Sequence, residues 1–137
     1  MITSDKQYHA AKEQMDMLKQ SLKAPIKKDV PAIVANAARA QLKELIIELN
    51  TSIEEYQDLI KNKKHVEIEI HSLDDLLAAP IRYRLANHMS VEVFGRKVGV
   101  SARQIARYEK EEYQNINTST LQKILKELHV HINGKIV

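Results

Sequence analysis

Residues 90–109, SVEVFGRKVGVSARQIARYE, decide the expected fold of the chain. Ser90 is placed to cap a first short helix, because its hydroxyl can accept a hydrogen bond from a free N–H of the first turn. Phe94 and Val98 are four residues apart, so they fall on one helix face. Gly99 follows the last apolar position, where a helix can end in the left-handed region that glycine enters at low cost. The stretch therefore predicts a short helix that stops at a tight turn.

A second short helix is expected directly after this turn. Ser101 can cap it, its inner face is Ile105 and Tyr108, and Gly95 leaves room for the two helices to approach each other. Its outer stripe, at steps of four and three, is basic and consists of Arg103, Arg107 and Lys110. Two short helices joined by a tight turn, with basic side chains outside, are typical of a DNA-binding helix-turn-helix. The alternative is an ordinary helical hairpin with a solvated basic face.

The composition of the 137 residues suits a soluble, mainly helical chain of one domain or two small units. One Phe, five Tyr and no Trp predict an aliphatic core, and only three Gly and three Pro favour helices. No run of 18 apolar residues is present and the N-terminus lacks an apolar signal sequence, so no membrane segment is expected. The absence of Cys excludes disulfides and fits a cytoplasmic protein.

Charge is distributed unevenly, although the net charge is only +3. Between residues 82 and 107 the only acidic side chain is Glu92. The six basic residues of that stretch are Arg82, Arg84, Arg96, Lys97, Arg103 and Arg107. Three acidic residues follow, at positions 109, 111 and 112. A basic surface bounded by an acidic one suits docking on phosphates in a fixed orientation.

The first 64 residues are expected to form a helical unit of their own. A capping box of Ser4 and Gln7 begins a helix that runs to about Lys23. Pro31 begins a second helix, and a break at residues 50–52 separates it from a third, shorter one that ends at residues 61–64. The second helix has an apolar face wide enough to pack on more than one neighbour. That face comprises Val30, Ile33, Val34, Ala37, Ala38, Leu42, Leu45, Ile46 and Leu49.

Two stretches alternate between apolar and polar residues and predict a short β element. Val66, Ile68 and Ile70 share one face of the first stretch. A single strand is unstable alone, and residues 129–137 are its expected partner because they also alternate and contain Asn133-Gly134, a hairpin signal. Pairing within the chain and pairing across a dimer axis both remain open.

Helices are also expected on both sides of the helix-turn-helix. Residues 72–88 form one, in which Pro80 either begins the main helix or kinks a longer one. Thr118 or Asn117 caps the last helix. The expected inward residues are Leu73, Leu76, Leu77, Ile81 and Leu85 in the first, and Leu121, Ile124, Leu125 and Leu128 in the last. The predicted fold is mainly α, with a helical unit at residues 1–64 and a helix-turn-helix domain at residues 65–137.

No catalytic, metal or cofactor site is expected. The chain has no Gly-rich phosphate loop, Gly-x-Ser-x-Gly elbow or His-Glu-x-x-His motif. His129 and His131 would share a strand face, but without a third ligand they are read as solvent-exposed histidines. Glu67 and Glu69 are read as a charged strand edge that discourages aggregation. The sequence does not predict an enzyme.

Several runs with family-like spacing lie in the second half of the chain. They are Leu76-Leu77-x3-Ile81-Arg82-x2-Leu85, VGVSARQIARYE at residues 98–109, Glu112-Tyr113 and Ser119-Thr120-Leu121. With these runs, residues 73–130 resemble the lambda-repressor/Cro-like (XRE) helix-turn-helix family, and Ile105-x-x-Tyr108-Glu109 is the most diagnostic piece. The chain departs from the usual pattern at Pro80, at Val91 and in its strand-like tail.

A looser resemblance concerns the first half. Ile2-Thr3-x4-Tyr8-x2-Ala11-x6-Leu18, followed by a Leu/Ile-rich helix, is similar to antitoxins of the HigA type. That resemblance implies an N-terminal unit that helps to hold a RelE/HigB-like mRNA-cleaving toxin, and a second half that represses the shared operon. The alternatives are a stand-alone repressor whose first unit only dimerises, and a protein-interaction module that no longer binds DNA.

The expected DNA-binding mode is a homodimer whose recognition helices enter successive major grooves of an inverted repeat in double-stranded operator DNA. Arg103 and Arg107 would contact bases or phosphates, and Ala102 and Ala106 are small enough to seat the helix deeply. Backbone N–H groups at helix N-termini would bind phosphates. The expected DNA-binding residues are Ser90, Ser101, Ala102, Arg103, Gln104, Ala106, Arg107, Lys110 and Thr118.

Overall fold

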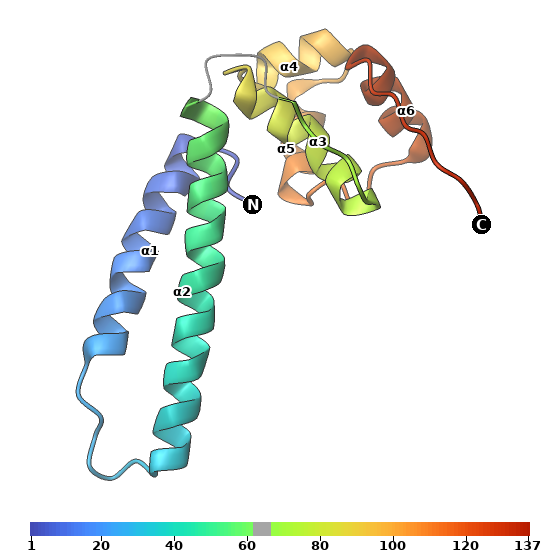
Figure 1. Cartoon of the computed structure of the whole chain (residues 1–137). Coiled ribbons are helices and arrows are strands. Elements are labelled where there is room, and N and C mark those ends of the chain that lie inside the picture. Colours follow the sequence, from blue (N-terminus) through green and yellow to red (C-terminus); the bar gives the residue numbers. More distant parts are fainter. Residues whose placement is uncertain (62–66) are drawn as a thin grey trace. The chain divides into compact units, whose positions relative to one another are not determined.

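The computed structural model describes residues 1–61 and 67–137, and these contain six α-helices. The helices are α1 (Asp5–Lys23), α2 (Ala32–Lys61), α3 (Leu73–Ala86), α4 (Val91–Val98), α5 (Ala102–Lys110) and α6 (Thr118–Glu127) (Figure 1). They belong to two compact units, Met1–Asp58 and Leu59–Val137, here called unit 1 and unit 2. The prediction of a mainly helical fold is confirmed.

Unit 1 begins with α1, and the sequence predicted both where this helix starts and where it ends. Ser4 Oγ accepts a hydrogen bond from Gln7 N at 3.2 Å, as a capping box requires. The return bond goes one residue further back than expected, since Gln7 Oε1 accepts from Thr3 N at 2.8 Å. The helix ends at Lys23, next to Ala24 in an extended conformation and Pro25.

The predicted break at residues 50–52 is wrong, because α2 is continuous over 30 residues. The polar side chains that suggested a new helix start are bonded within the existing helix. Asn50 Nδ2 donates to Glu54 Oε1 at 3.1 Å, and Thr51 Oγ1 donates to the carbonyl oxygen of Ile47 at 3.0 Å. Each bond spans one helical turn, so these residues do not compete with the helical backbone. The helix is described as far as Lys61. The rest of its predicted end, residues 62–64, lies outside the described residues.

The core of unit 1 lies between one face of α1 and one face of α2. Met15 of α1 and Ile53 and Tyr56 of α2 are buried. The rings of Tyr8 and Tyr56 stack with centroids 5.2 Å apart, and Gln57 Nε2 donates to the Tyr8 hydroxyl at 2.6 Å. Much of the broad apolar face expected on the second helix is solvent-exposed, however, including Ile33, Val34 and Leu45.

In unit 2, Pro80 lies inside α3 and does not end it. The helix is capped by Ser72, whose Oγ accepts from Asp75 N at 3.1 Å, and it continues to Ala86 with Pro80 buried. Leu77, Ile81 and Leu85 are buried as expected, but Leu73 is 67% exposed, so its inward assignment is wrong. Leu73 is the first residue of the helix, and the described helices leave it in solvent.

The core of unit 2 draws on every helix of the second half. Its largest fully buried side chains are Tyr113, Phe94, Ile81, Ile105, Ile124, Val98 and Pro80. Together they come from α3, α4, α5, α6 and the loop after α5. The helix α4 packs against both α5 and α6. The core is mostly aliphatic, as the composition predicted.

The predicted β element is not formed in the described part of the chain. Residues 67–70 and 129–137 contain no strand, and Val66 lies outside the described residues. The Asn133-Gly134 hairpin is also wrong, because a two-residue turn of this type needs positive φ angles and neither residue has one. The last residues are extended and exposed.

Candidate nucleic-acid interface

The turn between α4 and α5 depends on two glycines, each for a different reason. Gly99 ends α4 with φ of 73°, in the left-handed region expected for it. Gly95 faces the turn itself, since a Cβ atom built on it would lie 2.5 Å from the Val100 carbonyl oxygen and 3.3 Å from Ala102 N. Both neighbours are backbone atoms that cannot rotate away. The close approach of the two helices therefore requires glycine at position 95.

Capping side chains fix where α4, α5 and α6 begin. Ser90 Oγ accepts from Val93 N at 3.1 Å, and Ser101 Oγ accepts from Gln104 N at 3.2 Å. For α6 the cap is Asn117, whose Oδ1 accepts from Thr120 N at 2.8 Å. Each cap satisfies one N–H of the first turn, and the N–H groups before it remain available to an anion. Ser90 and Thr118 are exposed, so the N-termini of α4 and α6 are accessible.

The two faces of α5 differ sharply in burial. Ile105 and Tyr108 point into the core with 0% and 5% exposure. Ala102 is half-buried at the start of the helix. The exposed residues of α5 are Arg103, Gln104, Ala106, Arg107 and Lys110. The structure therefore brings the predicted outer residues of α5 together on one accessible surface, here called the α5 outer face (Ala102, Arg103, Gln104, Ala106, Arg107 and Lys110).

The cations of the α5 outer face are not neutralised within the described part of the chain. Arg103, Arg107 and Lys110 form no ion pair there. The Arg107 guanidinium lies over the ring of Tyr108, 5.3 Å from its centroid, which restrains its position. Gln104 is engaged locally, since the Ser101 hydroxyl donates to its Oε1 at 3.3 Å. All three cations are thus available to bind an anion.

Two of the six basic residues expected on the surface have other roles. Arg84 is buried, and its Nε and Nη2 donate to the two carboxylate oxygens of Glu109, both at 2.7 Å. Arg82 lies 3.6 Å from the Asp75 carboxylate and is partly neutralised. The assignments of Arg84 to a basic surface and of Glu109 to an acidic border are therefore wrong. The remaining exposed cations of that stretch are Arg96, Lys97, Arg103 and Arg107.

The Arg84–Glu109 pair joins three parts of unit 2. Arg84 belongs to α3 and Glu109 to the last turn of α5, while Arg84 Nη1 also donates to the Met89 carbonyl oxygen at 3.1 Å. Met89 directly precedes the Ser90 cap of α4. Two parallel hydrogen bonds join the Arg84 guanidinium to the Glu109 carboxylate. They therefore fix the relative orientation of the two side chains as well as the distance between them. It holds the C-terminal end of α5 at a fixed position relative to α3.

A lysine of α6 completes the turn from the other side. Lys123 Nζ donates to the Gly99 carbonyl oxygen at 2.9 Å. This carbonyl lies at the C-terminal end of α4, where a positive charge is stabilised by the helix dipole. Sequence reasoning missed both this contact and the Arg84–Glu109 pair, whose partners are 24 and 25 residues apart with no periodicity that connects them.

The chain leaves α5 through two residues in the left-handed region. Glu112 and Tyr113 have φ of 52° and 61°, and Tyr113 N donates to the Tyr108 carbonyl oxygen at 2.7 Å. The Tyr113 side chain is fully buried, and its hydroxyl has no hydrogen-bond partner in the described part of the chain. Burial, with the nearby Glu109 charge, raises the pKa of Tyr113. Tyr113 thus remains neutral and closes the core below α5.

Other kinds of site find little support in the described residues. They contain no group of three His, Asp or Glu side chains placed to hold a metal ion. His129 lies in the turn that ends α6, with φ of 55°, and not on a strand beside His131. Among the described helices, none has both the length and the apolar content needed to cross a membrane.

Comparison with known proteins supports the same region. Residues 81–134 match the family described as Helix-turn-helix. Neither the curated proteins nor the solved structures gave a match. The matched residues run from the buried part of α3 through α6 and include the glycine turn, the three caps and the α5 outer face. Residues 81–134 therefore form a helix-turn-helix domain of the XRE/Cro-like type.

Proposed function

We propose that this chain is a sequence-specific DNA-binding repressor, with α5 as the helix that enters the major groove. The observation that carries the proposal is the α5 outer face, where two exposed arginines lie on a helix whose other face is fully buried. The helix-turn-helix match at residues 81–134 supports DNA binding and transcription regulation. The Arg84–Glu109 pair supports it further, because a recognition helix must be held rigidly to read bases.

Each residue of the α5 outer face has a role that fits its chemistry. Arg103 and Arg107 can form bidentate bonds to guanine, and the small Ala102 and Ala106 allow a close approach and contact with a thymine methyl group. Lys110 near the helix end binds phosphate. The N-termini of α4 and α6, at Ser90 and Thr118, bind phosphates through backbone N–H groups and fix the orientation of the domain. Ser101 positions Gln104 at the edge of the face.

Replacing Arg107 tests the assignment of the recognition helix. Arg107→Ala should weaken binding to the chain's own promoter by roughly 5- to 150-fold, which corresponds to about 1–3 kcal/mol. Binding to a scrambled operator should change much less. Fluorescence anisotropy at fixed salt measures both affinities.

The matched control is Arg39→Ala, which removes an exposed arginine from α2 in unit 1. If Arg107→Ala keeps its specific affinity and an unchanged salt dependence, α5 is not the recognition helix. If the unmodified chain binds no promoter fragment at all, it is a protein-interaction module on a helix-turn-helix scaffold.

A second function, neutralisation of a RelE/HigB-like toxin, rests on unit 1. Ile33 and Ile47 of α2 are 81% and 66% exposed, and with Ala40 they repeat every seven residues. Such a repeat keeps side chains on one helix face. Ile53 and Tyr56, which pack within unit 1, fall on a different face. An exposed apolar stripe on a helix suits a protein partner. The similarity of the first residues to HigA-type antitoxins suggests a toxin as that partner.

Co-purification with the product of the neighbouring reading frame tests the antitoxin proposal. Ile47→Glu should abolish recovery of a small basic partner, because it places a charge in the apolar stripe, while Arg107→Ala should leave recovery unchanged. Relief of toxicity in co-expressing cells is the functional measurement. If no partner is recovered with the unmodified chain, the chain is a stand-alone repressor and unit 1 serves dimerisation alone.

A further inference from the structure

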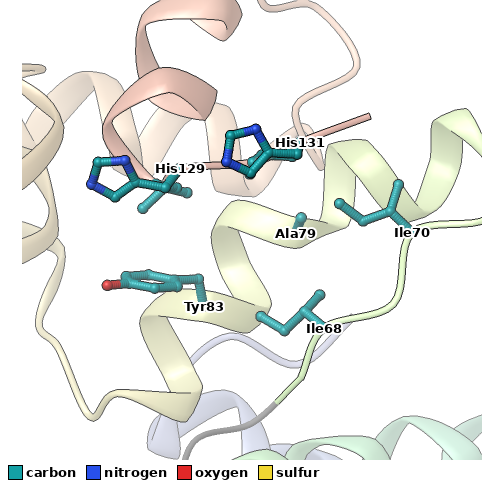
Figure 2. Close-up of a pocket in the computed structure, with 8 residues that line it drawn as sticks. Ile68, Ile70, Ala79, Tyr83, His129 and His131 are labelled. Carbon is teal, nitrogen blue, oxygen red and sulfur yellow. The ribbon is translucent and has the colours of Figure 1, made fainter. Parts of the chain in front are cut away.

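A cleft in unit 2 lies apart from the α5 outer face. It has a volume of about 280 Å³. It lies on α3, between residues 68–70 on one side and residues 128–131 on the other. Its residues are Ile68, Ile70, Ala79, Tyr83, Leu128, His129, Val130 and His131. Figure 2 shows the two imidazole rings on one side, Ile68 and Ile70 on the other, and Ala79 and Tyr83 from α3 between them. The cleft is thus lined by both apolar and polar side chains, with Ile68 and Ile70 on one side and the two histidines on the other.

The first of these segments has unused hydrogen-bonding capacity. Residues 67–70 form no backbone–backbone hydrogen bond within the described part of the chain. Their side chains alternate, with Ile68 and Ile70 half-buried and Glu67 and Glu69 exposed. The Glu69 carboxylate lies 3.0 Å from His71 Nε2, and its hydrogen bond and charge raise the pKa of His71. The segment is shaped like an edge strand that lacks a partner.

The C-terminal tail, residues 131–137, lacks a partner as well. It is exposed throughout, with Ile136 and Val137 at 105% and 120%, and it forms no backbone–backbone hydrogen bond in the described part of the chain. The tail passes beyond α6 and ends away from the helices of unit 2 (Figure 1). It does not fold back on itself, because Asn133 and Gly134 do not adopt the positive φ of a hairpin turn.

We propose that the tail of a second copy of this chain occupies the cleft and pairs as a β-strand with residues 67–70. The apolar side chains of the tail, Ile132 and Ile136, would cover Ile68 and Ile70. Its alternate residues would then face Glu67 and Glu69, and these alternate residues include Lys135 and His131. Opposite charges on facing strands are favourable. An extended segment added to an unpaired edge is a recurrent binding mode.

Reciprocal exchange of tails gives a closed two-fold dimer. Each copy offers one tail and one cleft, so two copies fill both clefts. This interface lies in unit 2 and is separate from the apolar stripe of α2. The proposal does not depend on DNA binding, and it is tested without DNA.

Cysteine cross-linking tests the pairing directly, because the chain has no cysteine of its own. Glu69→Cys and Lys135→Cys are made in separate chains, mixed under conditions of subunit exchange, and oxidised. The mixture should give a disulfide-linked heterodimer on a non-reducing gel, and neither variant alone should do so. A linked dimer of Lys135→Cys alone would indicate tail-to-tail pairing and overturn the proposal. With both substitutions in one chain, an internally linked monomer would indicate closure within the chain and also overturn it.

Sedimentation equilibrium gives an independent measurement. Ile136→Glu should raise the dissociation constant of the dimer at least about tenfold, since it places a charge beside the apolar side chains of Ile68 and Ile70. Ile136 is fully exposed in the single chain, so the fold itself should not change, and circular dichroism checks this. The control is Met17→Glu, which alters an exposed apolar residue of α1 in unit 1. Equal dimerisation of all three proteins, or a monomer throughout, would overturn the proposal.

Discussion

At the scale of single residues, Gly95 makes the sharpest prediction. Gly95→Ala should lower the free energy of unfolding of unit 2 by about 1–3 kcal/mol, because its Cβ would overlap the backbone at Val100 and Ala102. Urea denaturation measures the change. Gly134→Ala is the control, since a Cβ there meets no atom within 4 Å. Equal stability of the two variants would mean that α4 and α5 do not approach as closely as described.

The buried pair of Arg84 and Glu109 makes a second prediction. Arg84→Met should cost about 3–5 kcal/mol of unfolding free energy, because it leaves the Glu109 carboxylate buried without its partner. The double variant Arg84→Met/Glu109→Leu should recover a large part of that loss, since no charge is then buried. A double-mutant cycle from chemical denaturation measures the coupling. Independent, additive effects of the two substitutions would contradict a direct pair.

Residue-level prediction from the sequence worked where the chemistry is local. The caps Ser4, Ser90 and Ser101 and the left-handed Gly99 were predictable because each depends on its near neighbours in the chain. The Arg84–Glu109 pair was not, because Arg84 looks the same in sequence whether it faces solvent or a carboxylate from another helix. Only the packing of α3 against α5 removes both groups from water.

At the scale of elements, α2 shows how local signals can mislead. The sequence Asn-Thr-Ser at residues 50–52 predicted a break, yet the helix continues because Asn50 and Thr51 bond within it. The short β element failed for the opposite reason. Alternation at residues 67–70 and 129–137 is real, but a strand also needs a paired neighbour, and pairing is not encoded in one segment alone.

The continuity of α2 can be tested at Ser52. As an N-cap, Ser52 would stabilise the chain, and Ser52→Ala would cost about 1 kcal/mol. Inside a continuous helix, the same substitution should instead leave stability unchanged or raise it by a few tenths of a kcal/mol, about 0.5 at most, because Ala has the higher helix propensity. Thermal unfolding monitored at a helical wavelength distinguishes the two signs. A clear loss of stability would restore the predicted break.

At the scale of the whole molecule, the proposed interface should carry a measurable electrostatic signature. Replacing Lys110 by Ala should weaken binding to all DNA sequences alike and reduce the slope of log affinity against log salt by about 1 per chain. A salt series by fluorescence anisotropy gives this slope. Lys19→Ala in α1 is the matched control, because it removes one exposed charge from unit 1. The same loss in both variants would reflect net charge and not a phosphate contact.

The two units carry separate functional proposals, and they can be disproved separately. Unit 2 contains the residues matched as Helix-turn-helix, and its proposed chemistry is that of DNA. Unit 1 contains the exposed apolar stripe, and its proposed chemistry is that of a protein partner. Failure of toxin binding would leave the repressor proposal intact, and failure of promoter binding would leave the partner proposal intact.

Because α5 is held only through its buried face, its outer face is free to change during evolution. The side chains of Ala102, Arg103 and Ala106 make no hydrogen bond or ion pair within the described part of the chain, while Ile105, Tyr108 and Glu109 hold the helix in place. Substitutions at the first three positions should therefore be nearly silent for folding. A duplicated gene could then acquire a new target sequence one residue at a time, and a designer could randomise the same three positions to reprogram the protein.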